Sequence, residues 1–123
     1  MLRLIRGSSL LMAIVALGCA GDAGSNREPI VYAPGPTCTA WCEKAVGECQ
    51  AYAVEQAVCV QSCEEVLAAG RQTSAPCGEA VEATFSCAAE LDCQYIYDRV
   101  NQVNLDSYPC LAALENSDLT CTR

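Results

Sequence analysis

The sequence predicts an all-α fold: a small disulfide-stapled helical bundle built from two helical hairpins and preceded by a signal peptide and a flexible tether. Three features predict it. The chain begins with the layout of an export signal, ten of its eleven cysteines lie in the roughly 104 residues after Cys19, and residues 37–75 are rich in Ala and Glu and lack proline. A chain of this length forms one small domain. Small exported domains with modest cores commonly need disulfides.

Residues 1–18 have the pattern of a secretory signal peptide. Arg3 and Arg6 are the only charges, an apolar run extends from Leu10 to Leu17, and small residues surround Cys19. The run spans about 8 residues, whereas a membrane-spanning helix needs roughly 20. We therefore expect an export signal and no transmembrane anchor.

The residues around Cys19 resemble the lipobox of bacterial lipoproteins, with Ala16, Leu17 and Gly18 in the three positions before the cysteine. The resemblance implies that Cys19 becomes the mature N-terminus, is linked to diacylglycerol and attaches the protein to a membrane of the bacterial cell envelope. The alternative is cleavage after Ala20 and release of a secreted protein, because Gly18 and Ala20 also suit a general signal peptidase.

Residues 19–36 are expected to form the lipidated cysteine and a flexible tether, and residues 37–123 the disulfide-rich domain. The tether region contains Gly, Ser, Asn and three prolines, with no helical or alternating apolar pattern. Val31 and Tyr32 are the residues of this region expected to pack back onto the domain.

Four helices are expected in the domain. The first covers residues 37–50 with Thr37 as N-cap, and the second covers residues 54–70 and stops at Gly70. The third covers residues 74–92, with Ser74 or Ala75 as cap and Pro76 in the first turn.

The fourth expected helix covers residues 107–117, again with a proline, Pro109, just inside its start. Residues 94–106 have no clear pattern. They either extend the third helix or form a loop with a short extended piece.

Two CX3C pairs predict how the first hairpin is cross-linked. Cys38 and Cys42 are four residues apart, as are Cys59 and Cys63, so each pair places two sulfurs on one helix face. When the chain folds back between them, the two faces meet antiparallel with equal spacing. The expected bridges are Cys42–Cys59 near the turn and Cys38–Cys63 further out.

The remaining six cysteines are less constrained by their spacing. Cys49 has no partner left on the second helix, and its natural candidate is Cys77 at the start of the third. Nesting gives Cys93–Cys110 and Cys87–Cys121, with Cys87–Cys110 and Cys93–Cys121 left open. Each bridge is worth about 3 kcal/mol in a chain-entropy model, so the reduced protein is expected to lose its fold.

Two resemblances follow from these cysteines. The twin CX3C spacing over residues 38–63 resembles the helical hairpins of the small mitochondrial intermembrane-space translocase chaperones. The whole chain, with "CTAWCEKAVGEC" and "CVQSC" in Ala- and Glu-rich helices, is similar to small cysteine-rich putative lipoproteins of myxobacteria. The second resemblance implies an exported helical domain of unknown function and supplies no catalytic residues.

The composition excludes several classes of function. The chain has no histidine, which removes Ser-His and Cys-His nucleophilic pairs and His-containing metal sites, and it has no CX2C knuckle. After Cys19, fifteen acidic residues face five basic ones, a net charge of about −10 that disfavours nucleic acid as a partner. We expect a non-enzymatic protein without cofactor or metal, in which the acidic pairs Glu64–Glu65 and Glu90–Asp92 are solvated helix faces.

The aromatic residues are the candidate contact residues. Trp41 is expected mainly in the core, packed against a neighbouring helix; if exposed beside Tyr95 and Tyr97, it would suit contact with an unidentified protein or a glycan. Tyr52 and Tyr108 complete the aromatic set of interest.

Overall fold

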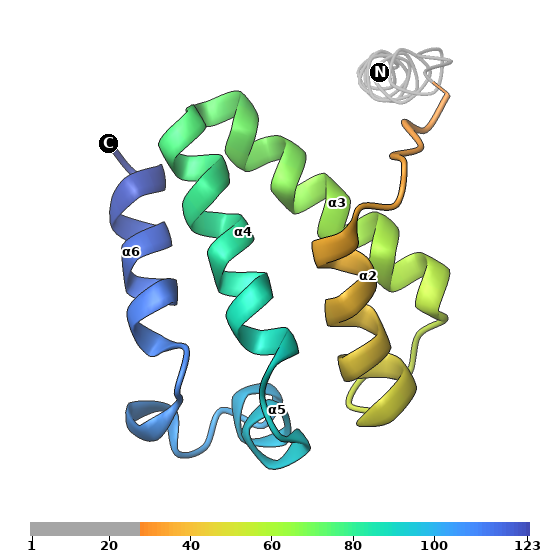
Figure 1. The fold of residues 1–123 in the computed structure, drawn as a ribbon, viewed down its shortest axis with the longest axis vertical. Coiled ribbons are helices and arrows are strands. Elements are labelled where there is room, and N and C mark those ends of the chain that lie inside the picture. The colour runs from red at the N-terminus through yellow and green to blue at the C-terminus, as the bar shows by residue number, and fades with distance from the viewer. Residues whose placement is uncertain (1–27) are drawn as a thin grey trace, which may run out of the picture. The chain divides into compact units, whose positions relative to one another are not determined.

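The structure, a computed structural model, describes residues 28–123, so the expected signal peptide, Cys19 and the first part of the tether lie outside the described residues. All regular secondary structure in residues 28–123 is helical (Figure 1). In chain order the elements are α2 (Pro36–Cys42), the π-helical η1 (Glu43–Glu48), α3 (Gln56–Thr73), α4 (Ala75–Ala89), α5 (Cys93–Val100), the 3-10 turn η2 (Leu105–Ser107) and α6 (Leu111–Cys121).

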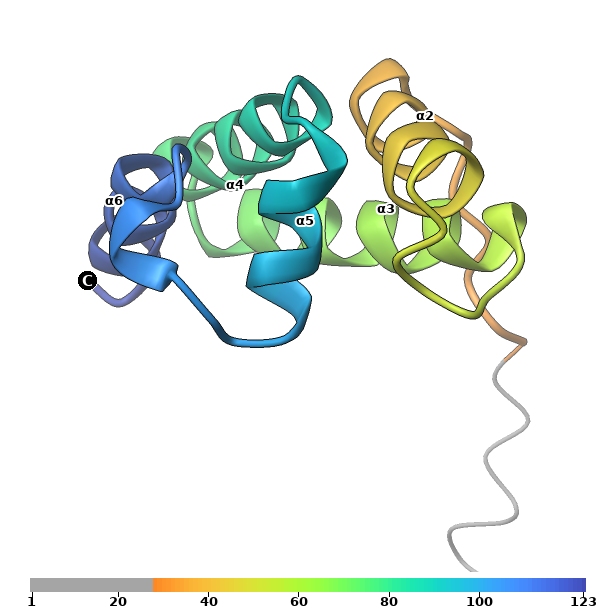
Figure 2. The same cartoon turned by 90° about the horizontal axis from the view of Figure 1, so that it is seen from below.

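Two helical hairpins make up residues 31–123. In the first, α2 and η1 turn back into α3; in the second, α4 and α6 run antiparallel, with α5 and η2 between them along the chain (Figure 1). α4 packs against α3, α6 and α2, so it joins the two hairpins. Figure 2 shows α3 running beneath both α2 and α4. The expected all-α, disulfide-stapled fold is confirmed.

Helix α2 begins one residue before the expected cap. Pro36 occupies the first turn, where its missing N–H costs no hydrogen bond, and Gly35 is the N-cap. The Thr37 hydroxyl instead donates to Oε1 of Glu82 on α4, at 3.0 Å. Thr37 as N-cap is therefore wrong, because its side chain is used in a contact between helices.

Helix α3 continues three residues past Gly70. A Cβ added at Gly70 would lie 3.4 Å from the Cα of Gly78 and 3.3 Å from a methyl carbon of Val81. Gly70 thus allows α3 and α4 to approach closely and does not end the helix, which contradicts the expected stop. The helix ends at Ser74, which is also the N-cap of α4 and accepts a hydrogen bond from the Cys77 N–H at 3.1 Å.

The second hairpin differs from the expectation at two points. Residues 93–100 form the separate helix α5, which begins after the extended residue Asp92 and buries Ile96, so neither alternative for residues 94–106 is right. α6 begins at Leu111 and not near residue 107. Tyr108 is extended, as the residue before a proline prefers to be, and this delays the helix.

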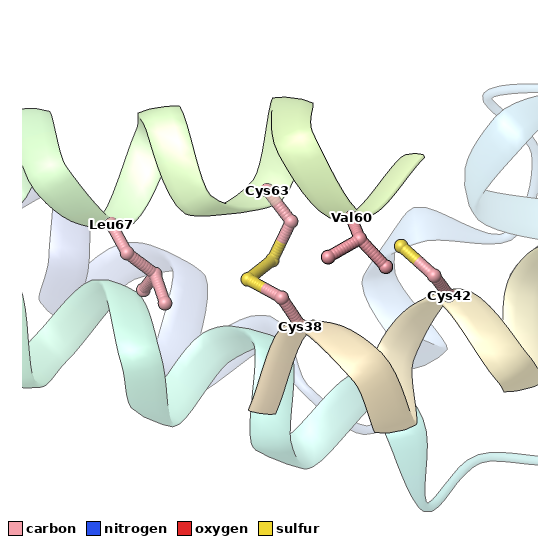
Figure 3. Packing of buried hydrophobic residues seen from close by; sticks show 5 residues of the cluster. All are labelled: Cys38, Cys42, Val60, Cys63 and Leu67. Carbon is pink, nitrogen blue, oxygen red and sulfur yellow. A yellow bond between two sulfur atoms is a disulfide. The ribbon is translucent and has the colours of Figure 1, made fainter. Parts of the chain in front are cut away.

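The first hairpin contains the bridges Cys38–Cys63 and Cys42–Cys59, the two that the CX3C spacing predicts. Figure 3 shows Cys38 and Cys63 joined between the helices, with Val60, Leu67 and Cys42 in the same packing layer. Six of the thirteen buried apolar residues in the described chain are cysteines. The disulfides are therefore a large part of the core itself.

The other three bridges correct the expected pairing, since the structure forms Cys49–Cys93, Cys77–Cys121 and Cys87–Cys110. The 18 residues of α3 span about 27 Å and carry Cys77 to the end of the molecule away from Cys49. There it meets Cys121, where α6 ends. Three expected bridges are therefore wrong: Cys49–Cys77, Cys93–Cys110 and Cys87–Cys121. Of the alternative that was left open, Cys87–Cys110 is present and Cys93–Cys121 is wrong.

The last residues before α2 are attached to α3. The Tyr32 N–H donates to Oε1 of Gln61 at 2.9 Å, and the Gln61 amide donates back to the Tyr32 carbonyl at 2.8 Å. The Gly35 N–H donates to Oε1 of Glu64 at 2.6 Å. Tyr32 therefore packs back as expected, Val31 is 78% exposed, and any flexible tether ends before residue 32.

Candidate functional site

An apolar groove crosses the two hairpins on one side. Two adjoining pockets, of about 290 and 420 Å³, share four lining residues: Trp41 from α2, Tyr52 from the turn before α3, Val66 from α3 and Phe85 from α4. We call this surface the aromatic groove. Pockets of this size with mainly apolar walls are typical of binding sites.

Three aromatic rings form the centre of the groove. The ring of Trp41 lies edge-on to that of Tyr52, with centroids 6.4 Å apart, and is tilted against that of Phe85 at 6.2 Å. Trp41 is half-buried and packs on the cluster of Cys38, Cys42, Val60, Cys63 and Leu67. The expected core role of Trp41 is thus combined with one exposed edge in the groove.

Tyr95 and Tyr97 are not part of this groove. They lie on α5, about 38–39% exposed, and line neither of the two pockets. The Tyr97 hydroxyl donates to the carbonyl of Cys49, close to the bridge from Cys49 to Cys93. Trp41 therefore shares neither pocket with these two tyrosines, which α5 carries where it packs against η1. A contact role for Tyr95 and Tyr97 stays a prediction.

The smaller pocket opens onto exposed valines. Val54 and Val58, at 46% and 52% exposure, line it together with Trp41 and Tyr52, and Val66 is 49% exposed. Exposed apolar residues scattered singly are ordinary, but a group of them around a concave aromatic surface marks a contact site. We call Val54, Val58 and Val66 the valine rim.

The larger pocket adds polar groups to apolar walls. Arg99 from α5, Tyr108 from the segment before α6 and Asp118 from α6 all line it. Burial raises the pKa of the Tyr108 hydroxyl, and the positive charge of Arg99 partly offsets this increase while Tyr52 adds to it. The pocket therefore has one buried phenol within the electrostatic reach of a cation.

Two further hydroxyls of the larger pocket already donate to the backbone. The Thr84 hydroxyl lies 3.1 Å from the Ala80 carbonyl and 3.2 Å from the Ala113 carbonyl, and the Ser117 hydroxyl lies 2.9 Å from that of Leu114. Their protons are committed to α4 and α6. Four side chains of this pocket keep protons to donate, namely Arg99, Tyr108, Trp41 and Tyr52; of these, Arg99 carries the charge and Tyr108 is the most buried.

The acidic pairs do not form a catalytic arrangement of the kind that glycosidases use. Glu65, Glu90 and Asp92 are exposed, as expected for solvated faces. Glu64 is 6% exposed and bonded to Gly35, so its assignment to a solvated face is wrong. In residues 28–123 no group of three His, Cys, Asp or Glu side chains is placed to hold a metal ion.

Some groove residues were identifiable from the sequence and others were not. Tyr52 and Tyr108 belong to the aromatic set, and Phe85 lies four residues after Val81 on one face of α4, a pattern that marks a packing face. Arg99 had no local signal. It reaches the pocket from α5, which the Cys49–Cys93 bridge joins to the end of η1.

Comparison with known proteins gives no relative for this chain. No protein-family model matches it, and neither a curated protein nor a solved structure does. No helix in the described part of the chain is long and apolar enough to cross a membrane.

Proposed function

We propose that the protein is a non-enzymatic, lipid-anchored component of the bacterial cell envelope that acts as an interaction module. The export signal and the sequence around Cys19 support the anchor. All ten later cysteines are paired in five disulfides, which indicates an oxidising compartment.

The observation that carries the interaction role is the aromatic groove with its valine rim. Trp, Tyr and Phe side chains in a concave, partly desolvated surface are the residues that dominate binding energy at protein contacts. Disulfides on both sides of Trp41, at Cys38 and Cys42, hold the groove in one shape before any partner arrives. Such preorganisation lowers the entropy cost of binding. A protein partner fits this surface best, and a glycan is the alternative.

The anchor is tested by labelling with radioactive fatty acid in a host that processes lipoproteins. The wild-type chain is expected to incorporate label and to partition with membranes, whereas Cys19→Ala does neither. Intact mass should show an acylated N-terminal Cys19 and ten cysteines that alkylate only after reduction. An unlabelled wild-type protein would remove the anchor from the proposal.

The interaction role is tested by photo-crosslinking in cells that display the protein. A photoreactive amino acid at Val58, on the valine rim, should give a discrete crosslinked product. The same residue at Ala57, its exposed neighbour on α3 outside both pockets, serves as the matched control. Equal crosslinking at the two positions would exclude the groove as the contact surface.

The second candidate is a secreted effector or inhibitor-like module. The small residues Gly18 and Ala20, which permit cleavage after Ala20, favour it. Recovery of the protein from culture supernatant with Gly21 as its N-terminus would support release over anchoring.

A further inference from the structure

The larger pocket of the aromatic groove contains a buried phenol without a partner. Tyr108 is 8% exposed, and its hydroxyl makes no side-chain hydrogen bond to any residue in 28–123. In these residues, every side-chain oxygen or nitrogen that is fully buried has a hydrogen-bond partner. Since the Tyr108 hydroxyl has no partner, it is accessible, and it is reached from the pocket that Tyr108 lines. A hydroxyl that is open to a pocket and has no protein partner is a ready hydrogen-bond donor for a ligand.

Arg99 supplies a cation at the same place. The two ion pairs among the described residues, Lys44–Glu48 and Arg71–Glu82, do not use it, and its side chain is only partly exposed. Arg99 and Tyr108 line the same pocket, and the charge of Arg99 partly offsets the increase that burial causes in the pKa of Tyr108. Asp118 lines the pocket as well but forms no ion pair with Arg99.

Most of the remaining lining of the pocket is apolar. Trp41 and Phe85 form one side, and Val81 and Leu114 contribute aliphatic surface from α4 and α6. The volume of about 420 Å³ suits a small molecule, and a pocket of this kind, with an apolar body and a few convergent polar groups, orients its ligand by those groups.

We infer that this pocket binds a small amphipathic carboxylate, with the carboxylate held by Arg99 and Tyr108 and the hydrocarbon part against Trp41 and Phe85. The guanidinium and the phenol provide donors for both carboxylate oxygens, and charge-assisted bonds of this kind are among the strong ones. A single positive group in a protein of net charge −8 favours a monoanion over a multiply charged phosphate. The inference goes beyond the proposed function, which concerns the lipid anchor and a contact with a macromolecular partner at the aromatic groove and its valine rim, because it assigns a small ligand to the larger pocket of that groove.

Trp41 makes the test direct, because it is the only tryptophan in the chain and lines the pocket. The oxidised protein carrying Cys19→Ala is titrated with decanoate, 1-decanol and decylammonium, which share one hydrocarbon chain and differ in charge. Trp41 fluorescence and calorimetry report binding. Decanoate is expected to bind saturably and about tenfold more tightly than either matched compound.

Three variants separate anion recognition from apolar binding. Arg99→Gln is expected to weaken decanoate about tenfold and leave 1-decanol unchanged, and Tyr108→Phe to weaken decanoate about two- to tenfold. Asp118→Asn is expected to bind decanoate at least as tightly as the parent protein. Glu115→Gln, which neutralises an exposed charge on α6 outside the pocket, is the control and should change nothing.

Any of three results would overturn the inference. The first is that decanoate shows no saturable binding, and the second is that decanoate and 1-decanol bind with equal affinity both to the parent protein and to Arg99→Gln. The third is that the parent protein prefers decylammonium and that Asp118→Asn abolishes this preference. Unchanged circular dichroism and thermal midpoint of each variant exclude loss of fold as the cause. None of these results alters fatty-acid labelling at Cys19 or crosslinking at Val58, so failure here is distinct from failure of the proposed function.

Discussion

Removal of the Cys49–Cys93 bridge is expected to destabilise the protein more than removal of Cys38–Cys63. A disulfide stabilises mainly by restricting the unfolded chain, and the effect grows with the length of the loop that it closes. The relevant loop is the shortest covalent path left when the bridge is absent. The nesting of the five bridges makes this path very different for the two pairs.

The path lengths follow from the connectivity. Without Cys38–Cys63, the bridge Cys42–Cys59 still joins the two helices. The covalent path from residue 38 to residue 63 then consists of four residues on each helix, about 8 residues in all. Without Cys49–Cys93, the shortest path leads back to Cys42, across to Cys59 and on to Cys93, about 41 residues. Chain entropy then gives about 2.5 kcal/mol for Cys38–Cys63 and about 4 kcal/mol for Cys49–Cys93.

The experiment compares two double variants, Cys38→Ala with Cys63→Ala and Cys49→Ala with Cys93→Ala. Urea unfolding without reductant, followed by Trp41 fluorescence and far-ultraviolet circular dichroism, gives the free energy of unfolding. Intact mass must first show four disulfides in each. We expect the second variant to be less stable by about 1.4 kcal/mol. Equal stabilities, or the reverse order, would refute the argument from chain entropy.

Four smaller predictions concern individual residues. Gly78→Ala should lower the free energy of unfolding by about 1–2 kcal/mol through overpacking, because the added Cβ would lie 3.1 Å from the Cα of Arg71. Gly47→Ala is the control and should not destabilise the protein, because its Cβ would meet only a side-chain oxygen at 3.7 Å. Thermal unfolding compares the two variants. Ser74→Ala should cost about 1 kcal/mol through loss of the α4 cap, measured by urea unfolding. Glu64→Ala should free the Gly35 N–H and expose the segment before α2 to proteolysis, so an unchanged cleavage rate would contradict that role. Burial raises the pKa of Tyr108 in the folded state above its ordinary value of about 10. The contribution of Tyr108 to stability is therefore intact below that pH and falls above it. Tyr108→Phe should accordingly lose less of its free energy of unfolding than the wild type as the pH rises above about 10.

The sequence alone was sufficient for the first hairpin. Cys38, Cys42, Cys59 and Cys63 repeat at one helical turn, so their pairing depends on local geometry and a single chain reversal. The signal is weaker for the second hairpin, since Cys77 and Cys87 on α4 are ten residues apart whereas Cys110, the N-cap of α6, is eleven residues from Cys121. These spacings are only approximately matched, so the pairing there depends on how α4 and α6 pack.

The groove is harder to predict because its residues come from seven separate segments. Trp41, Tyr52 and Phe85 stand out in composition, since aromatics are few, but their common position depends on how α2 and α4 pack over α3. Arg99 and Tyr108 lie on connections whose paths no periodicity describes. Both line the pocket only because tertiary packing brings α5 and the segment before α6 to it.

The sequence by itself determined the helical class, the matched cross-links of the first hairpin and Ser74 as the N-cap of α4, because each depends on local residue patterns. Tertiary structure decided which ends of the helices meet. The length of α3 separates Cys77 from Cys49, and the close approach at Gly70 and Gly78 sets α4 against α3. The aromatic groove exists only after those contacts form, since no single helix contains enough of its walls.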